Sequence, residues 1–257
     1  MQTRFLQLAS PALPVGAYSY SQGLEWAIES GAVSSTQTAD VWIRDHLQLV
    51  FARFEAPLYV AAFGVWAALS SSPLGRGIKG EGRGAPNTFG HDANALSLSL
   101  NLPPGRRELM RLNAAFIASR ESAEPRAETV QVGFSYAAWC REVAPLGDLQ
   151  CETLVAITSP CAPVVASLAA CACGLSARDG LLAYVFGFAE NQVTVLAKAL
   201  PLGQIAAQKM LFALSDAIET CVNIALDLPE DNWSSASPLL AISQMKHETQ
   251  YSRLFRS

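Results

Sequence analysis

Few residues of this chain have the types and spacing that chemistry requires. Its histidines are His46, in a predicted helix, His91, in a glycine-rich stretch, and His247, near the C-terminus. His247 lies beside Glu248 in the tail, and an exposed neighbouring pair of this kind is far more often structural than catalytic. No pairing of a base with a nucleophile can be identified. We therefore predict no catalytic residue.

Motifs that bind phosphate or metal are also missing. The sequence has no Gly-x-x-x-x-Gly-Lys-Ser/Thr loop, no Gly-x-Ser-x-Gly elbow and no His-Glu-x-x-His helix. Of the six cysteines, Cys171 and Cys173 are closest in sequence, but residues two apart on a helix point roughly 200° apart. Free cysteine is among the most buried residue types. We predict thiols packed in the core, no metal site and no cofactor.

The composition favours a protein that binds another protein. Of the 257 residues, 51% are hydrophobic and 16% are charged, so further apolar burial against a partner is expected. A net charge of −4 argues against nucleic acid as the main ligand. No uninterrupted apolar run reaches the ~18–20 residues of a membrane span, and the N-terminus has no signal-peptide core. We predict a cytoplasmic protein with no membrane partner.

The clearest periodicity lies in residues 176–228, and it predicts a helical hairpin. Apolar residues recur at three- and four-residue steps after Ser176 and Asp179, which have the pattern of a capping box. Pro201 must end this first helix, because the residue before a proline is pushed out of the α region. A second, continuous helix is expected to reach Leu228. We predict that this hairpin is the centre of an all-α fold.

The rest of the chain is expected to form helices between loops marked by proline and glycine. Capping-box patterns at Ser19 and Ser34 predict two helix starts. A long helix from 106 to about 143 should be kinked or split by Pro125, and its charged stretch at 119–128 is interpreted as a solvated face. Further helices are expected at 58–69, with a break or new start at Pro57, and at 149–157 and 164–173. Residues 1–257 are thus predicted to form a single-domain bundle of about ten helices.

Residues 70–105 differ in amino-acid composition from the rest of the chain. They are rich in glycine, serine and proline and have no usable hydrophobic period. Such a segment cannot bury enough apolar surface to offset the entropy of ordering it. We predict a flexible, dispensable insertion here.

The C-terminal tail, residues 245–257, is unusual for a solvated terminus. It carries Tyr251, Leu254 and Phe255 among arginines, and tyrosine and arginine are enriched at binding hot spots. Termini that are not held down are usually disordered. From these residues alone, docking on a partner and packing within the chain are equally good interpretations.

Four segments together resemble the urease accessory protein UreF family, in the family's order and over essentially the whole chain. The first is Leu8 to Glu25, and its motif residues are Pro14, Gly16, Ser19, Ser21, Gly23 and Glu25. The others are Ser119-Arg120-Glu121, then Pro201-Leu202-Gly203-Gln204 with Gln208, and the ending from His247 to Ser257. The chain departs from the family pattern in its long insertion and in Pro125, where a helix-compatible residue is expected.

The resemblance implies an all-α, non-catalytic maturation factor that dimerises. It implies binding to the accessory protein UreD (also called UreH) and recruitment of the nickel-carrying GTPase UreG to apo-urease. The partner-binding residues implied in the tail are His247, Glu248, Tyr251, Arg253, Leu254, Phe255 and Arg256. A possible GTPase-facing or other interface comprises Gly203, Gln204, Gln208, Arg120, Glu121, Glu124 and Arg126.

Two other functions fit the residues less well. A generic helical scaffold with no nickel role would need a repeat of about 30–45 residues if it were a solenoid, and none is visible. A metal-binding carrier would need histidines and cysteines at ligand spacing, which this sequence does not have.

We expect the purified protein to hydrolyse no GTP, because it has neither a phosphate-binding loop nor a base–nucleophile pair. Steady-state phosphate release should equal that of a buffer blank. Turnover that survives the removal of trace GTPase would contradict the prediction.

Overall fold

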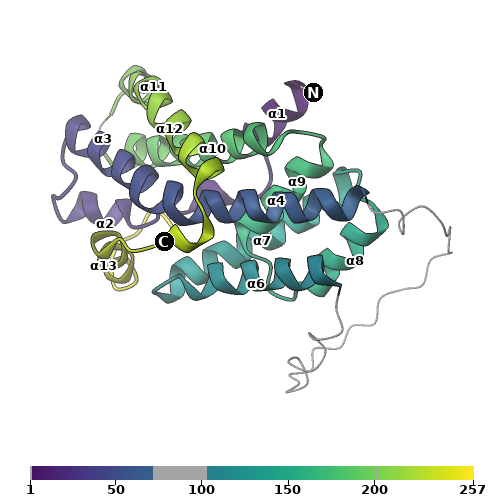
Figure 1. Cartoon of the computed structure of the whole chain (residues 1–257). Helices are drawn as coiled ribbons and strands as arrows, with labels where there is room; N and C mark the ends of the chain where they lie inside the picture. The colour runs from purple at the N-terminus through teal and green to yellow at the C-terminus, as the bar shows by residue number, and fades with distance from the viewer. Residues whose placement is uncertain (1, 72–102, 201) are drawn as a thin grey trace.

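The computed structural model describes residues 2–71, 103–200 and 202–257 (Figure 1). All regular elements in these residues are helical, which confirms the all-α class. They are α1 (Gln2–Ala9), η1 (Ala17–Ser19), α2 (Leu24–Glu29), α3 (Thr36–Asp45), η2 (His46–Glu55), α4 (Ala56–Ser71), α6 (Pro104–Ala118), α7 (Ala123–Val143), α8 (Asp148–Ala156), α9 (Ala162–Ala172), α10 (Ala177–Ala199), α11 (Gln204–Ala213), α12 (Ser215–Asp227), η4 (Glu230–Asn232) and α13 (Pro238–His247). Most of the predicted 70–105 insertion, with His91, and Pro201 of the predicted bend lie outside the described residues.

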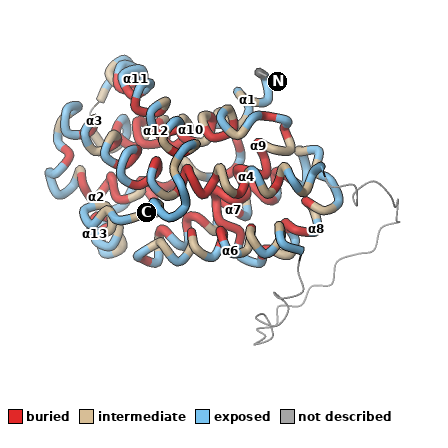
Figure 2. Tube along the Cα trace, in the orientation of Figure 1, coloured by how far each residue is buried: buried red, intermediate tan, exposed pale blue. Residues whose placement is uncertain are grey.

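The core lies where α4, α7 and α10 pack around α9, and their facing sides are buried (Figure 2). Every residue from 161 to 170 is buried, as expected for a helix that is apolar all round. Trp66 of α4 is fully buried and donates its Nε1–H to the Val164 carbonyl at 2.9 Å, so its polar group is satisfied. The buried free cysteines are Cys140, Cys161, Cys173 and Cys221, as predicted, while Cys151 and Cys171 are partly buried.

α3, η2 and α4 form one continuous helix whose middle, η2, is π-helical. A π-helix bonds i to i+5 and has about 4.4 residues per turn, against 3.6 in an α-helix. Nine residues therefore make about two full turns instead of two and a half. This winding places His46 and Glu55, nine residues apart, on the same side, and both line a partly open cavity.

The predicted break at Pro57 is wrong, because the helix continues through it. A proline inside a helix lacks an N–H, so a carbonyl in the preceding turn loses its helical donor. The Arg53 carbonyl, in that turn, accepts the backbone N–H of Ser234 at 3.0 Å. A distant loop thus supplies a donor to the turn before Pro57.

The first helix of the predicted hairpin is confirmed and the second is corrected. α10 begins after Ser176, whose hydroxyl oxygen accepts the Asp179 N–H at 3.0 Å, and ends before Leu200, which is extended. The second helix is two, α11 and α12, separated at Leu214. The Leu214 N–H is shared between the carbonyls of Met210 and Leu211, which tightens the last turn of α11. The apolar period runs through this junction, so the sequence pattern does not reveal it.

Pro125 neither kinks nor splits a helix, so the predicted break of the 106–143 helix at this residue is wrong. The chain leaves the helix earlier, between α6 and α7, and Pro125 is the third residue of α7. The first N–H groups of a helix have no intrahelical partner, so a proline there loses no hydrogen bond.

The two capping boxes predicted near the N-terminus are shifted or absent. Gly23, in the left-handed conformation at φ 82°, precedes α2, while Ser19 lies in the 3₁₀ turn η1. α3 is capped by Ser35 with Thr38, one residue beyond the predicted Ser34.

Two helices have the length and composition to cross a membrane, namely Thr36–Ser71 and Ala177–Ala199. The search for uninterrupted apolar runs in the sequence did not detect either of them. Half or more of the apolar window of each, 50% and 61%, is buried inside the fold. Packing against neighbouring helices accounts for their apolar character, since a helix buried in a protein core can be as long and as apolar as a membrane-spanning one.

The close approach of α7 to the start of α9 gives a test of the packing. A Cβ at Gly133 would lie 2.0 Å from the Pro160 carbonyl oxygen, whereas one at Gly64 of α4 would meet nothing within 4 Å. We expect Gly133→Ala to lower the free energy of unfolding by at least about 1–3 kcal/mol. Gly64→Ala should raise it by about 0.5–1 kcal/mol, because alanine favours the helix. Urea unfolding measures both, and equal stabilities would contradict the packing described here.

Candidate functional site

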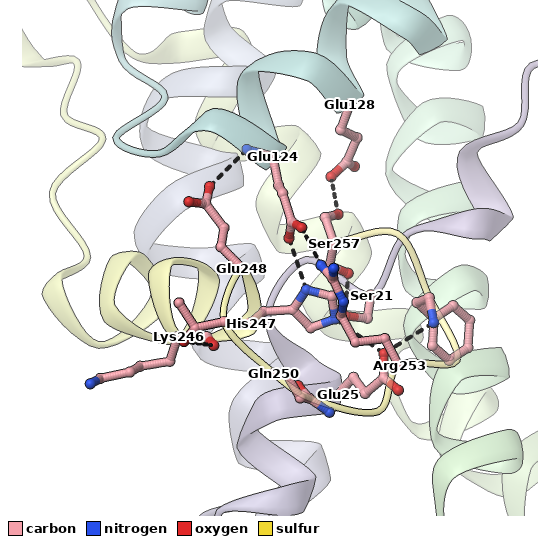
Figure 3. A network of polar contacts seen from close by, with 12 residues as sticks. Ser21, Glu25, Glu124, Glu128, Lys246, His247, Glu248, Gln250, Arg253 and Ser257 are labelled. Carbon is pink, nitrogen blue, oxygen red and sulfur yellow. Dashed lines mark hydrogen bonds and ion pairs between the residues drawn. The ribbon is translucent and has the colours of Figure 1, made fainter.

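The C-terminal segment from His247 to Ser257, here called the docked tail, lies against the N-terminal motif and the start of α7 (Figure 3). Residues from both ends of the chain therefore form one polar network. The docked tail leaves α13, follows a short turn and then bonds to residues 19–25.

His247 is the inner anchor of the docked tail. It is fully buried, with Nδ1 2.9 Å from Glu124 Oε2 and Nε2 3.1 Å from Glu25 Oε2. Each ring nitrogen thus has a carboxyl oxygen as its hydrogen-bond partner, so the ring is held from both sides. The expectation that His247 and Glu248 form an exposed pair is therefore wrong for His247.

Glu25 of α2 holds the backbone of the docked tail. Its Oε1 accepts the Leu254 N–H at 2.6 Å, and its Oε2 accepts the Phe255 N–H at 3.1 Å besides the His247 ring. The side chain is buried, and an ionised carboxylate tolerates burial only when it is paired and hydrogen-bonded. Glu25 meets that condition only while the tail is docked.

Two carboxyl groups meet at His247, and an arginine joins them. Arg253 donates to Glu124 Oε1, while Glu124 Oε2 and Glu25 Oε2 contact the two nitrogens of His247. Glu248 accepts the backbone N–H of Glu124 at 2.8 Å, in the first turn of α7. That bond lowers the pKa of Glu248, and the positive end of the helix favours its charge.

The end of the docked tail closes on the N-terminal motif. The backbone oxygen of Ser257 accepts the N–H groups of Ser21 at 2.6 Å and Gln22 at 3.0 Å, and also the Ser21 hydroxyl. The Arg256 N–H donates to the Ser19 carbonyl at 2.9 Å. Gly23 is required beside this turn, because its φ is 82° and a Cβ would lie 3.1 Å from the backbone of α13.

The docked tail buries one of its large apolar side chains and exposes two. Phe255 is buried, with the Lys198 ammonium 5.3 Å from its ring centre. Tyr251 is fully exposed and Leu254 is 69% exposed. Internal packing therefore accounts for Phe255, and a role in partner binding stays a prediction for the exposed residues.

A second cluster of ionisable groups surrounds a partly open cavity of about 90 Å³. Arg120 points into it, with its guanidinium 4.4 Å from the Phe116 ring centre and 3.9 Å from Glu55 Oε2. Glu55 accepts the Tyr184 hydroxyl at 2.7 Å, and Glu128 of α7 lines the same cavity. The interpretation of residues 119–128 as a solvated face is thus wrong for Glu128, which is buried, and for Arg120, which is partly buried.

Burial sets the protonation of these groups. It raises the pKa of Glu55, and it lowers the pKa of His46 to about 3, with a further contribution from Arg120. His46 is therefore neutral at ordinary pH, and its Nδ1 has no hydrogen-bond partner in the described residues. No three histidine, cysteine or acidic side chains in those residues are grouped to hold a metal ion. The cavity thus brings Arg120 together with the neutral His46 and the carboxyl groups of Glu55 and Glu128.

The structure separates the predicted site residues into two regions. α11 lies away from α13 in Figure 1, so its motif does not join the docked tail. On the N-terminal motif, Ser21, Gly23 and Glu25 are buried and Pro14, Gly16 and Ser19 are exposed. The exposed members of the possible interface set are Gly203, Gln204, Gln208, Glu121 and Arg126.

Four residues of these two clusters were not predicted as site residues from the sequence. They are His46, Glu55, Glu128 and Ser257. A polar residue inside an apolar helical stretch was the available signal for His46 and Glu55. Glu128 lies one turn after Glu124 and shares its face, but only the fold shows that this face is covered.

Comparison with known proteins gives a consistent result. The family model described as UreF matches residues 33–215. The chain is 43% identical to the urease accessory protein UreF of Azoarcus sp. (strain BH72), over 99% of this chain and 94% of that protein. It is 40% identical to the protein of the same name from Dechloromonas aromatica (strain RCB), over 99% and 96%.

Glu25→Gln should release the docked tail. One carboxylate oxygen is replaced by an amide group, so the His247 ring and the Phe255 N–H lose their acceptor. We expect the free energy of unfolding to fall by about 3–5 kcal/mol, the range for a broken buried pair. Glu29→Gln, exposed on the same helix, is the matched control and should change little. Equal urea-unfolding curves for the two variants would contradict the anchoring role of Glu25.

Proposed function

We propose that this chain, which belongs to the UreF family of urease accessory proteins, is a non-catalytic adaptor in the maturation of urease by nickel insertion. In this role it binds the accessory protein UreD, or UreH, and recruits and modulates the GTPase UreG on apo-urease. We further propose that it works in the cytoplasm as a homodimer. The family match supports the process, and the exposed part of the docked tail supports the contact with UreD.

The observation that carries the contact is a pair of exposed side chains on an anchored backbone. Tyr251 and Leu254 extend into solvent while His247, Phe255 and Ser257 are held inside. An ordered backbone reduces the entropy lost when its side chains are fixed by a partner. The same end of the molecule exposes Leu239, Ile242 and Met245 of α13.

Basic groups accompany this apolar surface. Lys246, Arg253 and Arg256 are exposed along the same segment. Arginine can bind carboxylates through two hydrogen bonds, and apolar anchors with arginines are typical of binding hot spots. The surface therefore fits a partner with apolar pockets and acidic groups at their rim.

The exposed face of α11 supports a second contact. Ile205 and Phe212 are 72% and 84% exposed there, beside Gln204 and Gln208 of the predicted interface. Because α11 lies away from the docked tail in Figure 1, two partners can be bound at once. We assign this face to the GTPase or to the second copy of the dimer.

The test is the double variant Tyr251→Ala, Leu254→Ala, titrated with purified UreD. Hot-spot anchors contribute about 2 kcal/mol or more each, so the affinity should fall about 30-fold if one of the two is an anchor and about 700-fold if both are. Unfolding by urea should change by less than about 0.5 kcal/mol, because both side chains are exposed. Point variants are preferable to truncation after Met245, which would also remove His247 and Ser257 from the internal network.

Phe212→Ala is the control, since it removes an equally exposed aromatic from α11. It should bind UreD as the wild type does. Undiminished binding of UreD by the double variant would show that the docked tail is not the contact surface.

A further inference from the structure

Two charged side chains that line the cavity each keep one polar atom without a hydrogen-bond partner among the described residues. These atoms are Nη1 of Arg120 and Oε2 of Glu55. Arg120 uses its other nitrogens, Nε and Nη2, to donate to Ser119 Oγ at 3.2 and 3.1 Å. Glu55 uses Oε1 to accept the Tyr184 hydroxyl at 2.7 Å. A guanidinium donor and a carboxyl acceptor thus remain unused beside each other.

The distance between these two atoms leaves room for a ligand. Nη1 of Arg120 and Oε2 of Glu55 are 3.9 Å apart, which is too far for a hydrogen bond between them. Only 14% and 11% of the two side chains is exposed, so bulk water has little access to them. A largely buried donor or acceptor without a partner is unfavourable. The gap between Arg120 and Glu55 therefore favours a molecule that bonds to both.

The other carboxyl group of the cavity is already satisfied. Glu128 Oε1 accepts the Gln22 Nε2–H at 2.6 Å, and its Oε2 accepts the Ser257 hydroxyl at 2.7 Å (Figure 3). Nδ1 of His46 has no partner in the described residues either, but that atom has almost no exposed surface. Among the charged side chains lining the cavity in the part of the chain that the structure describes, unpaired atoms therefore occur at Arg120 and Glu55.

Charge selects the chemical class of the ligand. A small anion bound to Arg120 would lie beside the carboxyl group of Glu55, and a small cation bound to Glu55 would lie beside the guanidinium of Arg120. His46 adds no charge to favour either, because burial lowers its pKa to about 3. A neutral molecule avoids both repulsions, provided that it carries an acceptor for Arg120 and a donor for Glu55.

A primary amide has this donor and acceptor at the required spacing. Its carbonyl oxygen and its nitrogen are about 2.2 Å apart, from the standard C=O and C–N bond lengths. Two nearly parallel hydrogen bonds of ordinary length can therefore bridge it to atoms that are 3.9 Å apart. The cavity of about 90 Å³ is several times larger than the ~10–15 Å³ that one water needs. Phe51, Phe116 and Phe188 also line it and can pack against an alkyl group.

We propose that the cavity is a binding site for a small primary amide, whose carbonyl oxygen accepts a hydrogen bond from Arg120 and whose N–H donates to Glu55. The site concerns the chain alone and needs no partner protein. Its failure would leave the proposed adaptor function unchanged.

Three molecules of one shape test the site on the wild-type protein. Acetamide, acetone and acetate differ in carrying an N–H donor, no donor or a negative charge. For four non-hydrogen atoms, the dissociation constant can be no lower than about 40 µM, so titration into the millimolar range is needed. We expect acetamide to shift the backbone amide NMR signals of Phe116, Arg120 and Tyr184 in a saturable way, and to bind at least about tenfold more tightly than acetone or acetate.

Each other outcome would overturn the proposal. Equal binding of acetone would identify an apolar pocket, and tighter binding of acetate would identify an anion site. No saturable shift with acetamide would leave a cavity that holds water only.

Arg120→Met tests the assigned donor, because it removes the guanidinium and keeps an unbranched side chain beside Phe116. Acetamide affinity should fall at least about tenfold, as expected for the loss of a hydrogen bond to a charged group. Arg107→Met, exposed on α6, is the matched control and should bind acetamide as the wild type does. Unchanged affinity in Arg120→Met would overturn the assignment. If this variant fails to fold by circular dichroism, the wild-type preference for acetamide over acetone and acetate decides the proposal by itself.

Discussion

The burial of one carboxylate, that of Glu25, is the constraint on which the arrangement of both chain ends depends. An ionised group withdrawn from water must be matched by donors, and α2 has none to offer it. The donors are the His247 ring and the N–H groups of Leu254 and Phe255. The fold can bury Glu25 only by bringing α13 and the docked tail onto the N-terminal motif. Glu124 then joins from α7, because the second nitrogen of His247 also needs an acceptor.

Side chains at the end of the docked tail are divided between the protein interior and solvent. Phe255 and Ser257 are buried, while Leu254 and Arg256 between and beside them are exposed. One set of residues anchors the segment and the other set is available to a partner, which explains how a single short motif can serve stability and binding together.

α7 links this network to the interior of the molecule. Glu124 and Glu128 are one helical turn apart, so they lie on the same face, yet the first belongs to the charge cluster and the second to the cavity wall. On the far side of the cavity the π-helical winding of η2 turns both His46 and Glu55 inward. π-helical turns are rare and are found frequently at functional sites. Here the winding determines which ionisable groups face the cavity.

What the sequence determined by itself is local or periodic. The all-α class, the start of α10 at the Ser176 cap, its end before Pro201 and the burial of four cysteines depend on a residue's neighbours within a turn or on its own type. The split at Leu214 and the π-helical winding were hidden because the apolar pattern continues through both. The tertiary structure alone decided the burial of His247, Glu25 and Glu128. His247 and Glu25 are 222 residues apart, and Glu128 and Ser257 are 129 apart. A buried charge is satisfied by whatever groups the other helices bring to it, and no local pattern states which groups those are.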